Sequence, residues 1–277
     1  MKTYERQYGD YATALGKVAI AKQIFATPKE GMTDRMKQGV NSDACKRWAW
    51  FDASFNEVDG RILATRDKFN PLSARDESGK LLYAQRATDA TRTGEFYLTN
   101  DVLFGNEPAK VVLLRIAEQD KKKPIDKRIV LDLGQTKTHD VPTDCYADDD
   151  TIVFLAEGYK RAGKYGLFVR NAFGENSIQS SRVYMQDLTG KDKVRGFALD
   201  RFDADDRSGF DCGRGLYVGS GSVFGGYERS AEGATQKIVP AYSAKDVRDA
   251  RREKERLAKI LQPDKLKAIS GLLGKLR

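Results

Sequence analysis

The sequence predicts a mainly β protein, in which an antiparallel β-sandwich body follows one helix and precedes two amphipathic helices. Between residues 80 and 230, short apolar runs alternate with Gly, Asp, Asn and Pro at a spacing of roughly 10 to 20 residues, which is typical of antiparallel strands. The 277 residues are 40% hydrophobic, which is enough for a packed core. We therefore expect a helical segment over 1–45, a β-rich body over 46–240 and a helical arm over 241–277.

The first 67 residues contain one clear helical pattern and one ambiguous stretch. In YATALGKVAIAKQIFA, Tyr11, Leu15 and Val18 share one helical face, and Pro28 ends the pattern. The polar residues that follow it lead to RWAWFDASFNEVDGRILATRD, which fits either a helix or a hairpin. We favour the hairpin, because Asp59-Gly60 is a typical two-residue turn.

Strand-like runs make up the body. None of them has a helical face of about 12 residues, so we expect strands rather than βαβ units. The runs are 80–87, 95–104, 110–119, 127–134, 151–158, 165–173, 181–188, 194–200 and 215–224.

The arm contains two basic amphipathic patterns that are separated by Pro263. In the second, LKAISGLLGKLR, five aliphatic residues form one stripe, and burying them is worth roughly 8 to 15 kcal/mol gross. A lone helix of this length is marginal in water, so the stripe needs a cover. The expected docking residues are Leu257, Leu261, Leu266, Ile269, Leu272, Leu273 and Leu276.

Two covers for the stripe fit equally well. It can pack on its own body, or it can dock on another subunit as a helix in a groove. A membrane surface fits less well, because the segment has basic flanks but no interfacial Trp or Phe.

Charge is concentrated in the arm. The chain carries a net charge of +8, and residues 245–277 hold 11 basic and 5 acidic residues, a net of +6. Together with the loop DKKKPIDKR at 120–128, the arm offers a possible phosphate-binding surface. The residues expected to contact nucleic acid are Lys121, Lys122, Lys123, Arg251, Arg252 and Arg256.

Part of the body resembles a known family. In AGKYGLFVRNAFG, Gly163, Tyr165 and Asn171 are spaced as in the G-x-Y-x-C-x-A-x-N-x-x-G run on the F strand of immunoglobulin-superfamily sandwiches, with Leu167 in place of the cysteine. The resemblance covers 151–190, or about 95–190 if the earlier strands belong to it. It implies a sandwich that is used for binding or assembly. The alternative is an ordinary hairpin with a buried tyrosine.

Residue types limit the chemistry that this chain can perform. His139 is the only histidine, which excludes a zinc site of two or three imidazoles and leaves one possible base beside an acidic loop. The three cysteines have no disulfide or CxxC spacing. Asp203, Asp205 and Asp211 are weak candidates for a cation site, because their order does not match a known calcium loop.

The sequence therefore predicts a non-enzymatic structural protein that assembles into a larger complex, with a bacteriophage virion component as the concrete analogy. No cofactor is expected, and its partners are expected to be protein subunits. A nucleic-acid-binding accessory protein is the alternative, and a metal-dependent hydrolase is a third hypothesis. Without an apolar run of about 20 residues or a signal sequence, we expect the protein in the cytosol, or in the virion if it is a phage component.

Overall fold

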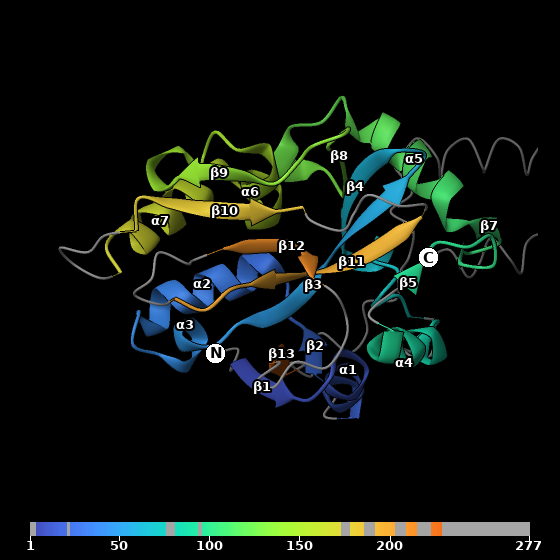
Figure 1. Ribbon diagram of the computed structural model, residues 1–277, viewed down its shortest axis with the longest axis horizontal. Coiled ribbons are helices and arrows are strands. Elements are labelled where there is room, and N and C mark those ends of the chain that lie inside the picture. The colour runs from blue at the N-terminus through green and yellow to red at the C-terminus, as the bar shows by residue number, and fades with distance from the viewer. Residues whose placement is uncertain are drawn as a thin grey trace, which may run out of the picture. The chain divides into compact units, whose positions relative to one another are not determined.

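The structure is a computed structural model, and it describes residues 4–20, 23–75, 81–93, 96–172, 178–185, 192–202, 209–214 and 223–228. Among these residues, eleven strands form one sheet, with helices packed beside it (Figure 1). The main path of this sheet runs β1 (Tyr4–Tyr8), β13 (Val223–Glu228), β3 (Ala49–Val58), β11 (Lys193–Leu199), β12 (Phe210–Arg214), β10 (Ser180–Tyr184) and β9 (His139–Pro142). Paired beside this path are β2 (Gln23–Phe25), β4 (Arg61–Arg66), β5 (Phe96–Tyr97) and β8 (Val130–Asp132).

Strand β3 is buried on both faces, and this divides the core into two apolar clusters. Phe51 and Phe55 belong to the cluster that contains residues of α2 (Pro28–Gln38), α3 (Asp43–Lys46), α6 (Asp150–Ala156) and α7 (Tyr159–Arg170). Trp50 and Val58 belong to the second cluster, which contains residues of α1 (Tyr11–Ile20), α4 (Ala84–Thr93) and α5 (Ala109–Asp120). Because neighbouring residues of a strand point to opposite faces, one ten-residue strand serves both clusters.

The predicted hairpin at Asp59-Gly60 is confirmed. Strands β3 and β4 pair antiparallel from Val58 opposite Arg61 onward. Asp59 has φ 51° and Gly60 has φ 77°, so both turn residues are left-handed, as a two-residue hairpin turn that follows the twist of the strands requires.

The N-terminal segment is not purely helical. The predicted helix is confirmed as α1 (Tyr11–Ile20), but β1 and β2 flank it, and both pair with β13. This segment therefore contributes strands to the sheet of the body, and the domain boundary expected at residue 45 stays a prediction. Two further helices follow in polar sequence, namely α2 (Pro28–Gln38) and α3 (Asp43–Lys46).

Several runs expected as strands are helices, so the antiparallel β-sandwich is not what the chain forms. The sheet-rich body is confirmed, but helices are as prominent as strands in the described residues. The remaining helices are α4 (Ala84–Thr93), α5 (Ala109–Asp120), α6 (Asp150–Ala156) and α7 (Tyr159–Arg170). The remaining short elements are η1 (Asp67–Phe69), β6 (Leu103–Phe104), β7 (Glu107–Pro108), η2 (Ile125–Lys127) and η3 (Thr143–Cys145).

The immunoglobulin resemblance is wrong for a clear structural reason. The run 151–158, which was expected as a strand, is helix α6, and the segment expected as the F strand is helix α7. Asp149 caps α6 by accepting a hydrogen bond from the Ile152 amide at 2.9 Å, and all of 151–156 is buried. Tyr165 therefore lies in the middle of a helix and does not form a tyrosine corner.

The sheet also mixes strand directions. β10 pairs with β12 in parallel, as β13 does with β3, whereas the other pairs are antiparallel.

No helix within the described ranges is long and apolar enough to cross a membrane. The arm expected over 241–277, with its two amphipathic helices, lies outside the described residues.

Candidate functional site

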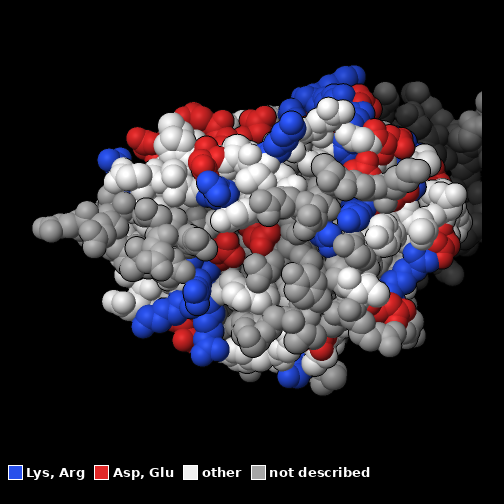
Figure 2. All heavy atoms as spheres, viewed as in Figure 1, with Lys and Arg blue, Asp and Glu red and all other residues white. Residues whose placement is uncertain are grey.

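Lys121 and Lys123 of the 120–128 loop lie beside acidic groups. Lys121 lies 2.6 Å from Glu118 and 3.8 Å from Asp132, while Lys123 lies 2.7 Å from Asp120. Figure 2 shows basic and acidic side chains side by side along the upper edge of this face. These ion pairs reduce the positive charge available to a phosphate. The three arginines expected to act with this loop, at 251, 252 and 256, lie outside the described residues.

His139 is engaged through both ring nitrogens. Its Nε2 lies 2.8 Å from Asp149 Oδ2, and its Nδ1 lies 2.9 Å from the Lys137 carbonyl oxygen. Burial alone would lower the pKa of His139, but these two acceptors, together with the charges of Asp149 and Asp140, raise it above its ordinary value. A protonated ring that donates from both nitrogens fits this geometry, which does not suit a general base.

Cys145 and the three candidate aspartates are the remaining groups of chemical interest. Burial, followed by the nearby Asp144, raises the pKa of the Cys145 thiol, so a thiolate nucleophile is disfavoured. Of the three aspartates suggested for a cation, Asp203 and Asp205 lie outside the described residues, and Asp211 lies on β12. The described residues contain no group of three possible metal ligands.

An apolar hollow lies between the C-terminal half of α2 and the C-terminal half of α7. Its volume is about 490 Å³, and its lining is mostly apolar. Leu167, one of the lining residues, has 59% of its surface exposed, which is high for a large aliphatic residue. The lining residues are Met36, Gly39, Val40, Lys164, Leu167, Phe168 and Asn171.

A buried arginine fixes the two helices that form the hollow. Arg35 of α2 is only 2% exposed and donates to the Tyr165 hydroxyl of α7 at 3.2 Å. It also donates to the carbonyl oxygens of Arg47 and Leu199 at 3.3 and 3.1 Å, and its guanidinium lies 5.2 Å from the Phe202 ring centroid. Because a buried charge is costly without partners, these contacts hold α2, α7 and β11 in one arrangement.

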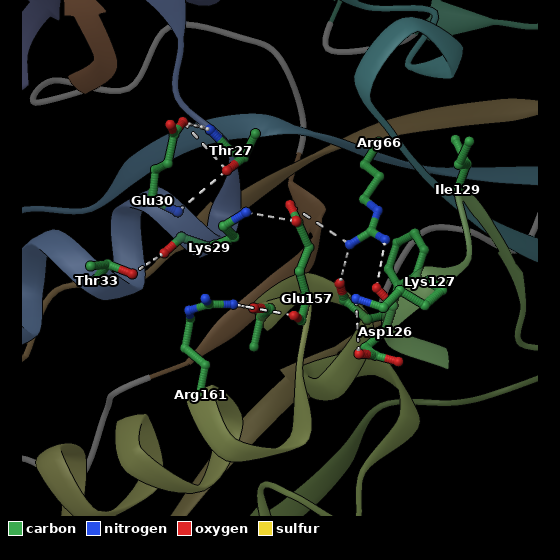
Figure 3. A network of polar contacts seen from close by, with 12 residues as sticks. Thr27, Lys29, Glu30, Thr33, Arg66, Asp126, Lys127, Ile129, Glu157 and Arg161 are labelled. Carbon is green, nitrogen blue, oxygen red and sulfur yellow. Dashed lines mark hydrogen bonds and ion pairs between the residues drawn. The ribbon is translucent and has the colours of Figure 1, made fainter. Parts of the chain in front are cut away.

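A polar network at the other end of α2 and α7 adds to this rigidity (Figure 3). Glu157, with φ 50° between α6 and α7, lies 2.9 Å from Lys29 of α2 and 3.7 Å from Arg66 of β4. Arg66 also donates to the Phe154 carbonyl oxygen at 2.9 Å, and Arg161 donates to the Glu157 carbonyl oxygen at 3.2 Å. The network therefore joins α2, β4, α6 and α7.

Sequence reasoning missed the hollow because it missed both helices that form it. For α2 a signal was present: Thr27 and Glu30 form a capping box, in which each side chain accepts from the other's backbone amide. For α7 the alternation of apolar residues resembled a strand. The exposure of Leu167 had no sequence signal at all, since it depends on which face of α7 meets the core.

Comparison with known proteins gives one informative match. No family model matches the chain, and no curated protein matches it. A solved structure described as "Accommodation of massive sequence variation in Nanoarchaeota by the C-type lectin fold" is similar to 82% of this chain and 95% of its own, with a TM-score of 0.54 and 14% sequence identity. At this identity the likeness concerns the fold alone, and it replaces the immunoglobulin-like interpretation with a C-type lectin-like one.

Proposed function

We propose that this chain is a non-enzymatic structural protein, which joins other copies of itself through the α2–α7 hollow. The single observation that carries the proposal is the hollow itself, with a largely exposed leucine on its wall. A contiguous exposed apolar surface, unlike a single exposed side chain, marks a contact with another molecule.

A second copy is the occupant that best matches the hollow. The same surface carries both a projecting side chain, Leu167, and an apolar recess beside it formed by Met36, Val40 and Phe168. A two-fold contact brings identical surfaces together, so the leucine of each copy enters the recess of the other. A second copy of this chain can therefore fill the hollow, and no different protein is needed as the partner.

The rigidity of the surface supports the same proposal. Arg35 ties α2 to α7, and Glu157 ties α2 to the α6–α7 junction, so little conformational freedom remains to be lost when a partner binds. The protein described as accommodating massive sequence variation has a similar fold. A fold that accommodates sequence variation suits a contact scaffold.

Light scattering of the full chain tests the proposal. We expect a dimer or larger species for the wild type and a smaller mass for Leu167→Glu, because the carboxylate would be buried in an apolar recess. The matched control is Val111→Glu on α5, since Val111 is 50% exposed and also aliphatic. It should keep the wild-type mass.

Three results contradict the proposal. One is a monomeric wild type, and another is an equal mass for Leu167→Glu and wild type. The third is a smaller mass after deletion of 241–277 but not after Leu167→Glu, which would move the contact to the arm.

A further inference from the structure

An aromatic and basic surface lies at the end of β1, where it meets α3. Tyr8, the last residue of β1, has 44% of its surface exposed. The Arg47 guanidinium lies 5.6 Å from the centroid of the Tyr8 ring, and Lys17 donates to the Tyr8 carbonyl oxygen at 2.7 Å. Figure 2 shows basic side chains gathered over this part of the molecule. We call Tyr8, Lys17, Lys46, Arg47 and Trp48 the β1–α3 surface.

Buried aromatic residues support this surface from below. Trp48 is half-buried, and its ring meets the ring of Trp50 edge to face, with centroids 4.7 Å apart. Trp50 is fully buried and makes a second edge-to-face contact with Tyr11 at 5.3 Å. The Trp48 ring is therefore the outermost of three packed aromatic rings, and the other two, Trp50 and Tyr11, lie in the core.

The backbone beneath Arg47 is fixed as well. Its carbonyl oxygen accepts a hydrogen bond from buried Arg35 at 3.3 Å. The side chain of Arg47 is 48% exposed, and its acidic neighbour Asp43 lies at 4.0 Å, which is a loose contact. The guanidinium thus keeps its charge available while its plane lies near an aromatic ring.

From this arrangement we infer that the β1–α3 surface binds single-stranded nucleic acid. Unpaired bases stack on aromatic side chains and on arginine planes, whereas bases in a duplex are already stacked on each other. Lys17, Lys46 and Arg47 are exposed cations within the same surface and supply the phosphate contacts. An acidic protein segment would use the charges but would not need the exposed Tyr8 ring or the half-buried Trp48 ring.

The inference differs from the basic sites expected from the sequence. Lys121 and Lys123 of the 120–128 loop contact carboxylates within the protein, and this loop has no aromatic residue. The β1–α3 surface combines cations with aromatic rings that come from residues 8 and 48, which are 40 positions apart in the sequence. The fold alone brings the Tyr8 ring to Arg47, the residue that precedes Trp48.

Binding can be followed with the protein's own fluorescence. The protein has two tryptophans, Trp48 and Trp50, and both belong to this group of packed aromatic rings. Titration with an oligothymidylate of about 12 nucleotides should quench their emission as bases stack. Three phosphate contacts predict that log K falls with log salt with a slope of about −2.

Substitutions in the full chain then separate stacking from charge. Tyr8→Ala should weaken binding about tenfold, and Tyr8→Phe should keep it within about twofold, because stacking requires the ring and not the hydroxyl. The matched control is Tyr159→Ala, since Tyr159 is 46% exposed and lies on α7. It should bind as the wild type does, and thermal unfolding checks that each variant is folded.

Four outcomes overturn the inference. They are the absence of binding at low salt, equal binding by Tyr8→Ala and Tyr159→Ala, and tighter binding of a duplex or of an acidic peptide than of the single strand. The fourth is binding that is abolished by deleting 241–277 but unchanged in Tyr8→Ala, which would assign it to the basic arm.

Discussion

The β3–β4 hairpin and the α6–α7 helix pair are both deeply buried, but they pack in different ways. In the hairpin, Ser54, Asn56 and Thr65 are fully buried polar residues that bond to one another. In the helix pair the buried face is apolar, and one glycine allows close approach to the preceding loop. The hairpin is thus specified by polar pairing and its turn, and the helix pair by shape.

Similar apolar runs form a strand in one case and a helix in the other, and the two differ in the residues at their ends. The hairpin strands meet at Asp59-Gly60, where left-handed backbone reverses the chain. The α6 run starts at the capping side chain of Asp149 and ends at left-handed Glu157. Turn and cap residues thus mark where these two runs begin and end, whereas their apolar content alone does not separate a strand from a helix.

The largest effect is expected from Gly166→Ala. A Cβ atom at Gly166 would lie 2.0 Å from the Thr143 carbonyl oxygen and 3.0 Å from the Tyr146 ring, so α7 must move away from η3. We expect the free energy of unfolding to fall by about 2 to 3 kcal/mol in urea unfolding.

Gly163→Ala on the same helix is the matched control. Its Cβ would lie 3.7 Å from the nearest atom, which is ordinary contact. If 159–170 is helical, this change should raise stability by about 0.5 to 1 kcal/mol. Equal effects of the two substitutions would show that the helix does not pack as described.

A smaller effect is expected in the hairpin. Gly60→Ala places a Cβ atom on a residue with φ 77°, although no atom lies within 4 Å of it. The cost should therefore be conformational strain alone, about 1 kcal/mol in the same urea assay. A stabilised variant would contradict the left-handed turn and with it the register of β3 and β4.

The smallest expected effect concerns pH. The pKa of His139 is raised in the folded protein, so its contribution to stability is complete below the unfolded value of about 6.5 and is lost as pH rises through the folded value. With 35% of the His139 side chain exposed, the contribution should stay below about 1 kcal/mol. Urea unfolding across this range should show the fall in wild type and a flatter profile in His139→Gln.

If the free energy of unfolding depends on pH in the same way for His139→Gln and the wild type, another titratable group causes the pH dependence. Asp140→Asn is the matched control, because Asp140 pairs with Arg182 at 2.7 Å and touches the histidine only through its charge. It should retain most of the wild-type slope.

Features that depend on local residue types could be predicted from the sequence. The 3.6-residue pattern of Tyr11, Leu15 and Val18 predicted α1, and Asp59-Gly60 predicted the hairpin. The single histidine limited the possible chemistry before any fold was known. In each case a few neighbouring residues contain the whole signal.

Tertiary structure alone decided the rest. Every residue in 151–156 is buried, so the run has no polar face, and its periodicity cannot separate a helix from a strand. The candidate surfaces depend on distant contacts: Leu167 is exposed because α7 turns Tyr165 inward toward Arg35, and Tyr8 meets Arg47 because β1 joins the sheet beside β13. Such contacts arise only when the whole chain is packed, because burial is a property of the assembled core and not of a sequence window.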